Sequence, residues 1–142
     1  MQTVKIYLAG AMGNLSIQEQ TKWRNEISEH INANITELKK EPIIFSPPNY
    51  YTRCNATYNS EREAMIFDLD KVRKSDLIIA NFENHSIGTI IEVAVAYENK
   101  IPILGLNRQW SKETHPWLTE SCIRVFDNLT QLISYVINFY LK

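Results

Sequence analysis

The chain has 142 residues, of which 44% are hydrophobic and 22% are charged. This composition is typical of one globular domain spanning residues 1–142, and it excludes a disordered or fibrous protein. The 15 basic and 16 acidic residues give a net charge of -1. Such a balance offers no electrostatic reason to expect a nucleic acid or an anionic membrane as the main partner.

The sequence carries no sign of a membrane anchor or of an oxidising compartment. No apolar run reaches the length needed to cross a bilayer, and residues 4–12 fit a strand better than a signal peptide. The two cysteines, Cys54 and Cys122, have neither a CxxC spacing nor the flanking histidines of a metal site. We therefore expect a cytoplasmic protein whose thiols are reduced and buried or half-buried.

The first half of the chain alternates short apolar runs with amphipathic segments. Residues 4–9 form an apolar run ended by a glycine, which indicates a strand. Residues 17–39 carry apolar side chains at three- and four-residue spacings and predict an amphipathic helix. A second strand is expected at 43–45, halted by two prolines, and a polar, aromatic loop is expected over 49–58.

The second half continues the same alternation. Ser60 is expected to cap a helix with acidic residues in its first turn and basic residues in its last, as the helix dipole favours. A very apolar helix is predicted at 88–99, and a helix with one apolar side at 128–141. The remaining strands are predicted at residues 76–82, 101–104 and 122–126.

Strands that alternate with helices predict an α/β protein with a doubly wound, flavodoxin-like sheet. The expected sheet has five parallel strands in the order 2-1-3-4-5, with right-handed crossovers and helices on both faces. In such sheets ligands bind outside the carboxyl ends of the strands, at the switch point between strands 1 and 3. The rule locates a site without saying what it binds.

Three of the four glycines follow the first and third strands, at the expected ligand end of the sheet: Gly10, Gly13 and Gly88. Without side chains they let backbone N–H groups approach a ligand, and a helix N-terminus there suits an anion. Tight turns between strand and helix would need glycine equally, so both explanations stay open. The chain has no GxGxxG or Walker signature, so nothing specifies a dinucleotide or another cofactor.

Glu92 is the only charged residue between Ile87 and Tyr97. A helix that is apolar nearly all round is typically buried, and a carboxylate one turn from its N-terminus is costly unless it is paired or functional. The helix would bring Glu92 close to the carboxyl end of the third strand. The alternative is a capping or surface glutamate on the one exposed edge of that helix.

Asp68 is the candidate for a second carboxylate. At about 100° per residue it falls between Met65 and Val72 in the apolar stripe of its helix, whereas Asp70 points away as a solvated partner for a lysine. Asp76, at the opposite end of the sheet, is expected to be structural. Two carboxylates at one apolar pocket suit glycosidic bond cleavage, in which one is ionised and the other holds a proton for the leaving group.

The aromatic and histidine residues are less specific. Tyr7 lies on the first strand and could orient a carboxylate through its hydroxyl, although a buried strand tyrosine more often belongs to the core. The tyrosines within residues 47–58 could stack on a flat base or pack as an ordinary surface loop. His30, His85 and His115 have no metal-ligand spacing, so no metal is assigned.

Three segments carry a family resemblance: the run Lys-Ile-Tyr-Leu-Ala-Gly at 5–10, Asp68 ahead of residues 75–80, and the pattern Gly-Thr-x-x-Glu-x-Ala-x-Ala at 88–96. Together they resemble the nucleoside 2-deoxyribosyltransferase family over nearly the whole chain. The Gly-Thr-x-x-Glu part alone also resembles phosphoribohydrolases of the lysine-decarboxylase-like group. The family resemblance implies the same doubly wound fold.

The resemblance also implies roles for individual residues. Glu92 would attack C1′ of the sugar and form a covalent glycosyl-enzyme, Tyr7 would position that carboxylate, and Asp68 would assist the leaving base as acid or binding group. A second base, or water, would then attack the intermediate from the other face, without metal or organic cofactor. The expected substrate-binding residues are Gly10, Met12, Gly13, Ser86, Gly88 and Ser121.

One position departs from the transferases, which usually carry an aspartate six residues before the nucleophile, where this chain has Ser86. A serine there resembles the related 2′-deoxynucleoside 5′-monophosphate N-hydrolases, where it binds the phosphate. Ser121 resembles a second phosphate-binding serine of that branch, supplied by the neighbouring subunit. However, the serine and arginine that those hydrolases carry after the first strand are Ala11 and Gly13 here. An aspartate would repel a phosphate and a serine would not, which favours a phosphorylated substrate.

We therefore expect an enzyme that cleaves the N-glycosidic bond of a 2′-deoxyribonucleoside or its 5′-monophosphate, working as a homodimer or higher oligomer. The acceptor of the sugar, base or water, stays open. One alternative is strict hydrolysis of a 2′-deoxynucleoside 5′-monophosphate. Another, from a different class, is a catalytically silent nucleotide-binding module on the same fold.

Overall fold

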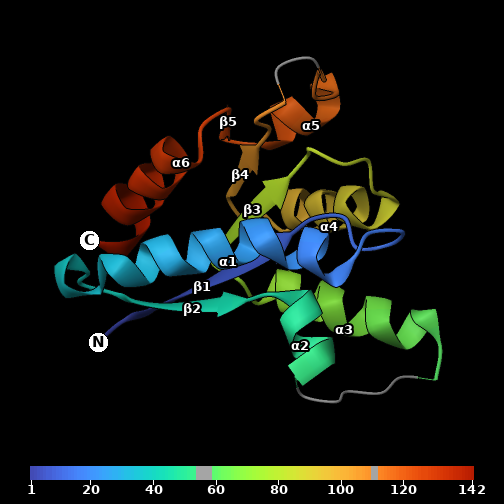
Figure 1. The fold of residues 1–142 in the computed structure, drawn as a ribbon, viewed down its shortest axis with the longest axis horizontal. Coiled ribbons are helices and arrows are strands. Elements are labelled where there is room, and N and C mark those ends of the chain that lie inside the picture. The colour runs from blue at the N-terminus through green and yellow to red at the C-terminus, as the bar shows by residue number, and fades with distance from the viewer. Residues whose placement is uncertain (54–58, 110–111) are drawn as a thin grey trace.

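The computed structural model describes residues 1–53, 59–109 and 112–142. Five parallel strands form one sheet in the order β2-β1-β3-β4-β5 (Figure 1). This confirms the order that the sequence predicts. The strands are β1 Thr3–Ala9, β2 Glu41–Phe45, β3 Leu77–Asn81, β4 Ile103–Leu106 and β5 Arg124–Phe126.

Helices cover both faces of this sheet (Figure 1). Their bounds are α1 Ile17–Ala33, the short 3-10 helix η1 Ile35–Glu37, α2 Pro47–Arg53, α3 Glu61–Arg73, α4 Ile87–Glu98, α5 Pro116–Ser121, α6 Leu129–Val136 and its π-helical continuation η2 Ile137–Leu141. On one face α1 and α6 bury Ile27 and Leu132, and on the other α3 and α4 bury Val72 and Val93. None of the described helices is long and apolar enough to cross a membrane.

Side-chain caps fix where the main helices begin. Ser16 and Ser60 each accept a hydrogen bond from a backbone N–H of the first turn, while the glutamate at that position reaches back to the cap. These capping boxes satisfy two backbone donors that would otherwise lack partners. Asn128 caps α6 in the simpler way, by accepting from the Gln131 N–H.

The pairing of β1 with β3 sets the position of the site. Ile6 lies level with Leu77 and Ala9 with Ala80, so the two strands end side by side. The chain leaves β1 toward β2 on one side, and it leaves β3 toward β4 on the other. The segments that follow the two strands therefore diverge and leave space between them, as expected at a switch point.

The helix predicted over residues 17–39 ends at Ala33 instead. Asn34 is its C-cap, and the chain then turns through η1 to enter β2. The turn is held in place because the backbone N–H groups of Lys39 and Lys40 both donate to the carbonyl of Leu141. The apolar periodicity could not reveal this stop, because it continues past Asn34 through Ile35 and Leu38.

β2 ends at Phe45, ahead of Pro47 and Pro48 as predicted, but the loop expected after the strand was wrong, because the two prolines begin α2. Proline suits the first turn of a helix, where its missing N–H would have no intrahelical partner. The segment expected as a loop at 49–58 is therefore partly helical, and residues 54–58 lie outside the described residues. The sequence also gave no sign of α5, which is too short for a periodic pattern.

Two strands begin two residues later than their apolar runs predict. β4 begins at Ile103, because Pro102 has no N–H to donate to the ladder. β5 begins at Arg124, because Cys122 is still the C-cap of α5. Both shifts leave the order and direction of the strands unchanged.

Candidate active site

A cavity of about 540 Å³ opens at the carboxyl ends of β1 and β3, where the topology predicts a ligand site. Its volume is in the range of pockets that bind small organic ligands. The segment after β1, helices α1 and α3, and the start of α4 form its walls. Its lining contains most of the residues selected from the sequence: Gly10, Met12, Gly13, Asp68, Ser86, Gly88 and Glu92.

Tyr7 and Glu92 are joined by a hydrogen bond across the sheet and helix layers. Tyr7 is fully buried on β1, and its hydroxyl donates to Oε2 of Glu92 on α4. The ring is fixed by stacking on Phe45, with centroids 5.4 Å apart. Burial, together with the negative charges of Glu92 and Asp68, raises the pKa of the Tyr7 phenol above its usual range, so the phenol keeps its proton and remains a donor.

The environment of Glu92 makes its protonation sensitive near neutral pH. Burial raises the pKa of the Glu92 carboxyl to about 7, because desolvation disfavours the charged form. The Tyr7 hydrogen bond and the positive charge of Arg24 lower this pKa, whereas the negative charge of Asp68 raises it. Both forms are therefore populated near pH 7. The ionised form is able to attack an electrophilic carbon, and the protonated form is not.

Asp68 and its neighbouring aspartates divide as the helical spacing predicts. Asp68 lines the cavity from α3 and is near enough to affect the pKa of Glu92. Asp70 lies on the solvent side, where it pairs with Lys74 at 2.9 Å. Asp76 accepts a hydrogen bond of 2.8 Å from the backbone N–H of Lys5, at the amino end of β3. Of these three aspartates, only Asp68 lies in the cavity with Glu92.

The glycines of the site serve different purposes. A Cβ at Gly10 would lie 2.6 Å from Cζ2 of Trp23, so the packing of α1 on the end of β1 requires a glycine there. A Cβ at Gly13 would meet nothing within 4 Å, and one at Gly88 only the Ser86 hydroxyl at 3.7 Å. No glycine of the chain has a positive φ. Close packing explains Gly10, and neither packing nor turn geometry explains Gly13 and Gly88, which leave open space beside the cavity.

Two hydroxyl groups lie at the N-terminus of α4, in the cavity wall. Ser86 is the N-cap, and its Oγ accepts from the Thr89 N–H at 3.2 Å. The Thr89 hydroxyl is buried and has no hydrogen-bond partner among the described residues. A helix N-terminus with free backbone donors favours an anionic ligand. The role assigned to Ser86 from the family resemblance stays a prediction.

Arg24 is a residue of the site that the sequence analysis missed. It enters the cavity from α1 and is only 1% exposed. Its guanidinium donates to the carbonyl oxygens of Leu8 at 3.3 Å, of Gly10 at 3.1 Å and of Gln20. Burial lowers the pKa of Arg24 to about 10, so the side chain is still a cation at neutral pH. The signal was its place three and seven residues before Ile27 and Ile31, on the apolar stripe.

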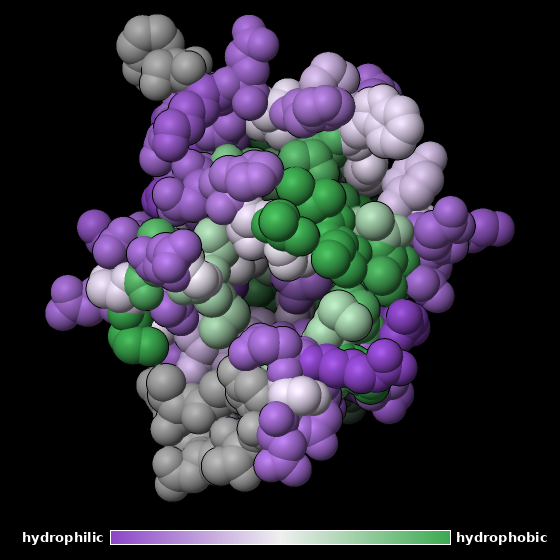
Figure 2. Space-filling model, turned by 90° about the vertical axis from the view of Figure 1, so that its right-hand side faces the viewer, coloured by the Kyte–Doolittle hydropathy of each residue, from purple (hydrophilic) through white to green (hydrophobic). Residues whose placement is uncertain are grey.

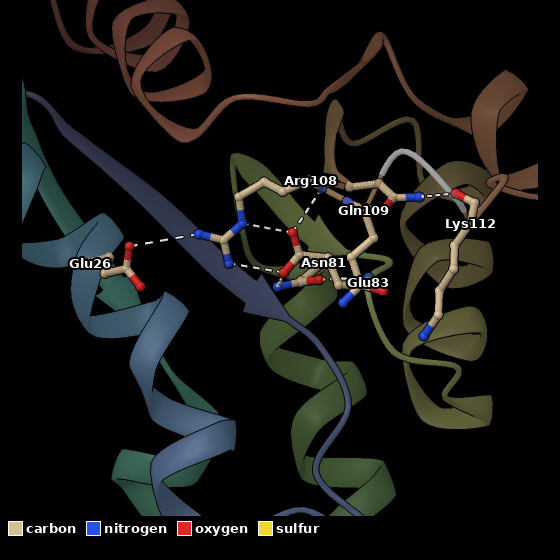
Figure 3. Close-up of polar contacts among 7 residues, drawn as sticks. Glu26, Asn81, Glu83, Arg108, Gln109 and Lys112 are labelled. Carbon is tan, nitrogen blue, oxygen red and sulfur yellow. Dashed lines mark hydrogen bonds and ion pairs between the residues drawn. The ribbon is translucent and has the colours of Figure 1, made fainter.

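An ion-pair cluster anchors the loop between β3 and α4, which carries Ser86 (Figure 3). Arg108, which follows β4, donates from Nε and Nη2 to both carboxylate oxygens of Glu83, at 2.7 and 2.9 Å. Its backbone N–H donates to the same carboxylate at 2.8 Å, and Nη1 lies 3.7 Å from Glu26 of α1. The side chain of Asn81 also bonds Glu83. The loop is therefore tied to two other elements.

Ser121 lies outside the lining of this cavity. It ends α5, and its hydroxyl donates to the Trp117 carbonyl at 2.6 Å. The adjacent Cys122 is a half-buried free thiol, and burial raises its pKa to about 12. Cys54 is outside the described residues. In the segments that the structure describes, no group of three or more His, Cys, Asp or Glu side chains is placed to hold a metal ion.

Part of the aromatic segment after β2 is packed rather than open to a ligand. Tyr50 stacks on Phe67 of α3 with ring centroids 4.8 Å apart, and it also contacts Phe45. The base-stacking role considered for this segment has no support at Tyr50. Tyr58 lies outside the described residues, and the same prediction for it stays open.

The surface of α4 corrects the expectation of a helix buried all round. Val93 faces the core, but the other side of the helix exposes large apolar side chains: Ile87, Ile90, Ile91 and Tyr97. We call these four residues the α4 face. Figure 2 looks onto this side of the molecule and shows apolar side chains, in green, gathered beside a hollow. Exposed apolar patches of this kind mark interaction sites in soluble proteins.

No protein-family model matches the sequence, and no curated protein matches it either. Solved structures do match. A 2-deoxyribosyltransferase from Bacillus psychrosaccharolyticus superposes with a TM-score of 0.68 at 19% identity, covering 93% of this chain and 92% of that one. The chain has a 2-deoxyribosyltransferase fold. A 2-deoxyribosyltransferase from Leishmania mexicana has a TM-score of 0.60 at 17% identity, over 97% and 99% of the two chains.

A CMP N-glycosidase from Clostridium botulinum also matches, with a TM-score of 0.58 at 18% identity, over 96% of this chain and 99% of that one. The 2-deoxyribosyltransferase fold thus extends over nearly the whole sequence. At these identities the likeness concerns the fold and does not extend to the chemistry of the site.

Proposed function

We propose that the chain belongs to the nucleoside 2-deoxyribosyltransferase family and cleaves the N-glycosidic bond of a 2′-deoxyribonucleoside or of its 5′-monophosphate. The observation that carries this proposal is the hydrogen bond from buried Tyr7 to Glu92, in a cavity that Asp68 also lines. The three side chains are those to which the family resemblance gives the catalytic roles. The shared fold with 2-deoxyribosyltransferases and an N-glycosidase supports the same reading.

The proposed reaction has two steps. The Glu92 carboxylate attacks C1′ of the sugar, the bond from C1′ to the base nitrogen breaks, and the electron pair leaves with the base. Asp68 assists by giving a proton or a hydrogen bond to that base. A second base or a water molecule then attacks C1′, breaks the ester bond to Glu92 and loses a proton. Two displacements retain the configuration at C1′.

The second candidate is a strict hydrolase of 2′-deoxynucleoside 5′-monophosphates. Ser86 stands in place of the usual aspartate at a helix N-terminus, and the Thr89 hydroxyl nearby has no partner in the described part of the chain, which favours an anionic group on the substrate. Ala11 and Gly13, where those hydrolases have serine and arginine, argue against it. The third candidate is a module that binds a nucleotide without catalysing a reaction.

A chromatographic assay with the purified protein separates these candidates. One set of reactions pairs each 2′-deoxynucleoside with a different free base, and a parallel set contains each 5′-monophosphate alone. We expect Glu92→Ala to lower turnover by about 10³-fold or more, and Glu98→Gln, an exposed site on the same helix, to leave it unchanged. A new nucleoside indicates the transferase, and free base from monophosphates alone indicates the hydrolase. Bound nucleotide without turnover would contradict both.

We also propose that the active form is a homodimer or higher oligomer in which a second copy covers the α4 face. Ile87 and Ile91 belong to that face and also line the cavity, as does the half-exposed Met65. A partner seated there would bury this apolar surface and exclude water from the reacting carbon. Ser121 lies outside its own chain's cavity and would act, as the resemblance implies, in the cavity of the neighbour.

A further inference from the structure

Arg24 is a buried cation that the proposed reaction does not yet use. Its side chain leaves α1, passes the end of β1 and reaches the same cavity as Glu92 and Asp68. Three hydrogen bonds to backbone carbonyl oxygens fix the guanidinium in place. The indole of Trp23 packs against it, with the guanidinium carbon 4.7 Å from the ring centroid. This position is rigid and shielded from solvent.

The partners of Arg24 are neutral. Carbonyl oxygens solvate a buried cation without cancelling its charge, and a charge held away from water is costly unless an opposite charge lies near. The acidic side chains that line the cavity with Arg24 are Glu61, Asp68 and Glu92. Of these, Glu92 is the one held against a buried tyrosine, where the surroundings screen charge poorly.

Four elements present titratable or charged groups toward Glu92. Tyr7 on β1 donates a hydrogen bond to it, and Asp68 on α3 faces it with a negative charge. His85 lies in the wall from the loop before α4, and Arg24 from α1 is the one lysine or arginine that lines this cavity within the described residues. Burial and Asp68 both oppose ionisation of Glu92. Arg24 and the tyrosine act in the other direction.

We propose that Arg24 is a positioning residue that increases the ionised fraction of Glu92 near neutral pH: its fixed positive charge, held on the carbonyl oxygens of Leu8 and Gly10, offsets part of the cost of burying the carboxylate. The inference deepens the proposed function, because a carboxylate attacks C1′ only in its ionised form. It also explains why an arginine is buried here although burying a charged side chain is unfavourable. Arg24 itself need not touch the substrate.

The direct test is the pKa of Glu92, measured by carbon NMR of glutamate labelled at the carboxyl, with Glu92→Gln to assign the signal. We expect Arg24→Gln to raise this pKa by about one unit or more, since an opposite charge nearby shifts a carboxyl by that amount. Arg24→Lys keeps a positive charge and should shift it less. Lys22→Gln removes an exposed cation from the same helix and should leave it unchanged.

An unchanged Glu92 pKa in Arg24→Gln would overturn the inference. The titration needs no substrate, so it stands even if the wild-type protein turns over nothing, which would defeat the proposed function alone. Where turnover exists, the acid limb of the pH profile of kcat/KM should shift to higher pH in Arg24→Gln, together with the Glu92 pKa. A merely structural role of Arg24 would not cause this shift.

A variant that does not fold is also informative. If Arg24→Gln is unfolded, the double variant Arg24→Gln/Glu92→Gln removes both members of the pair of charges. We expect the double variant to regain a cooperative thermal transition, because the uncompensated carboxylate is gone. A double variant as unfolded as the single one would contradict the coupling between Arg24 and Glu92.

Discussion

The raised pKa of Glu92 links the chemistry of the site to the stability of the fold. The carboxyl has a pKa of about 7 in the folded chain against an ordinary value of 4.5. Below pH 4.5 the carboxyl is protonated in both the folded and the unfolded state, so it does not make the free energy of unfolding depend on pH. Between 4.5 and about 7 the unfolded chain releases this proton first, so the free energy of unfolding falls as pH rises. Above about pH 7 the carboxyl is ionised in both states, and the free energy of unfolding falls no further on its account.

Glu92→Gln should remove this pH dependence, because an amide does not titrate. We expect the variant to gain stability relative to the wild type as the pH rises from about 4 to 8, by up to about 3 kcal/mol. Urea unfolding at a series of pH values measures the difference, and Glu98→Gln is the control for loss of a surface carboxylate. Parallel curves for wild type and Glu92→Gln would contradict a buried, proton-binding Glu92.

Individual residues of the candidate site were predictable from the sequence where a charged side chain interrupts an apolar pattern. Glu92 was visible because it is the only charge in an apolar helix, and Asp68 because it falls within an apolar stripe. Arg24 broke its stripe in the same way and was still missed. A long arginine side chain normally reaches the surface from such a position, and only the structure shows that its head group turns inward to three carbonyls.

At the scale of elements, the loop between β3 and α4 is held by contacts with distant parts of the chain. The bidentate pair of Arg108 with Glu83 joins it to the segment after β4, and Glu26 extends the contact to α1 (Figure 3). Glu83 is 8% exposed, so removing its partner would leave a poorly hydrated carboxylate. The loop would then rearrange to bring that carboxylate to water.

Arg108→Gln is therefore expected to loosen the loop that carries Ser86. Amide hydrogen exchange of residues 81–86 should accelerate by about tenfold or more, and the KM of any turnover should rise more than kcat falls, because the substrate-binding wall is displaced and the Tyr7–Glu92 pair is kept. Arg124→Gln, an exposed arginine on β5, is the control. Amide exchange of residues 81–86 at the wild-type rate in Arg108→Gln would show that the pair of Arg108 with Glu83 does not hold the loop.

The elements themselves were largely predictable, and the failures share a cause. Helices with caps and periodic apolar faces, such as those beginning after Ser16 and Ser60, lie where the pattern places them. The errors fall on short segments and on ends that other elements determine, as where the Leu141 carbonyl fixes the turn into β2. A pattern needs several turns to be visible, and α2 and α5 have too few.

For the molecule as a whole, the sequence could not tell a helix buried by its own chain from one buried by a partner. The apolar run of α4 predicts burial all round, and within the described residues the chain covers the side of Val93 and leaves the α4 face exposed. Periodicity records which side chains avoid water and not which molecule shields them. The α4 face is the surface on which the proposed second copy would sit.

Sedimentation velocity tests this assembly. We expect the wild type to be a dimer or larger, and Ile90→Glu to dissociate it, because a charge in the centre of an apolar interface is poorly hydrated. Turnover should fall with dissociation, since the cavity would lose its cover and the Ser121 of the neighbour. Ile35→Glu, at an exposed position on η1, should change neither. A monomeric wild type would refute the proposed interface.

The close approach of Gly10 and Trp23 couples the packing of the core to the position of Arg24 in the cavity. Any side chain at Gly10 would push the indole away, and Arg24 follows Trp23 on the same turn of α1 with Nη2 only 3.3 Å from that added atom. A change of packing here would therefore also move the positive charge that lines the cavity with Glu92. A Cβ added at Gly13 or Gly88 would meet no atom closer than 3.7 Å, so these two positions can change without moving Arg24.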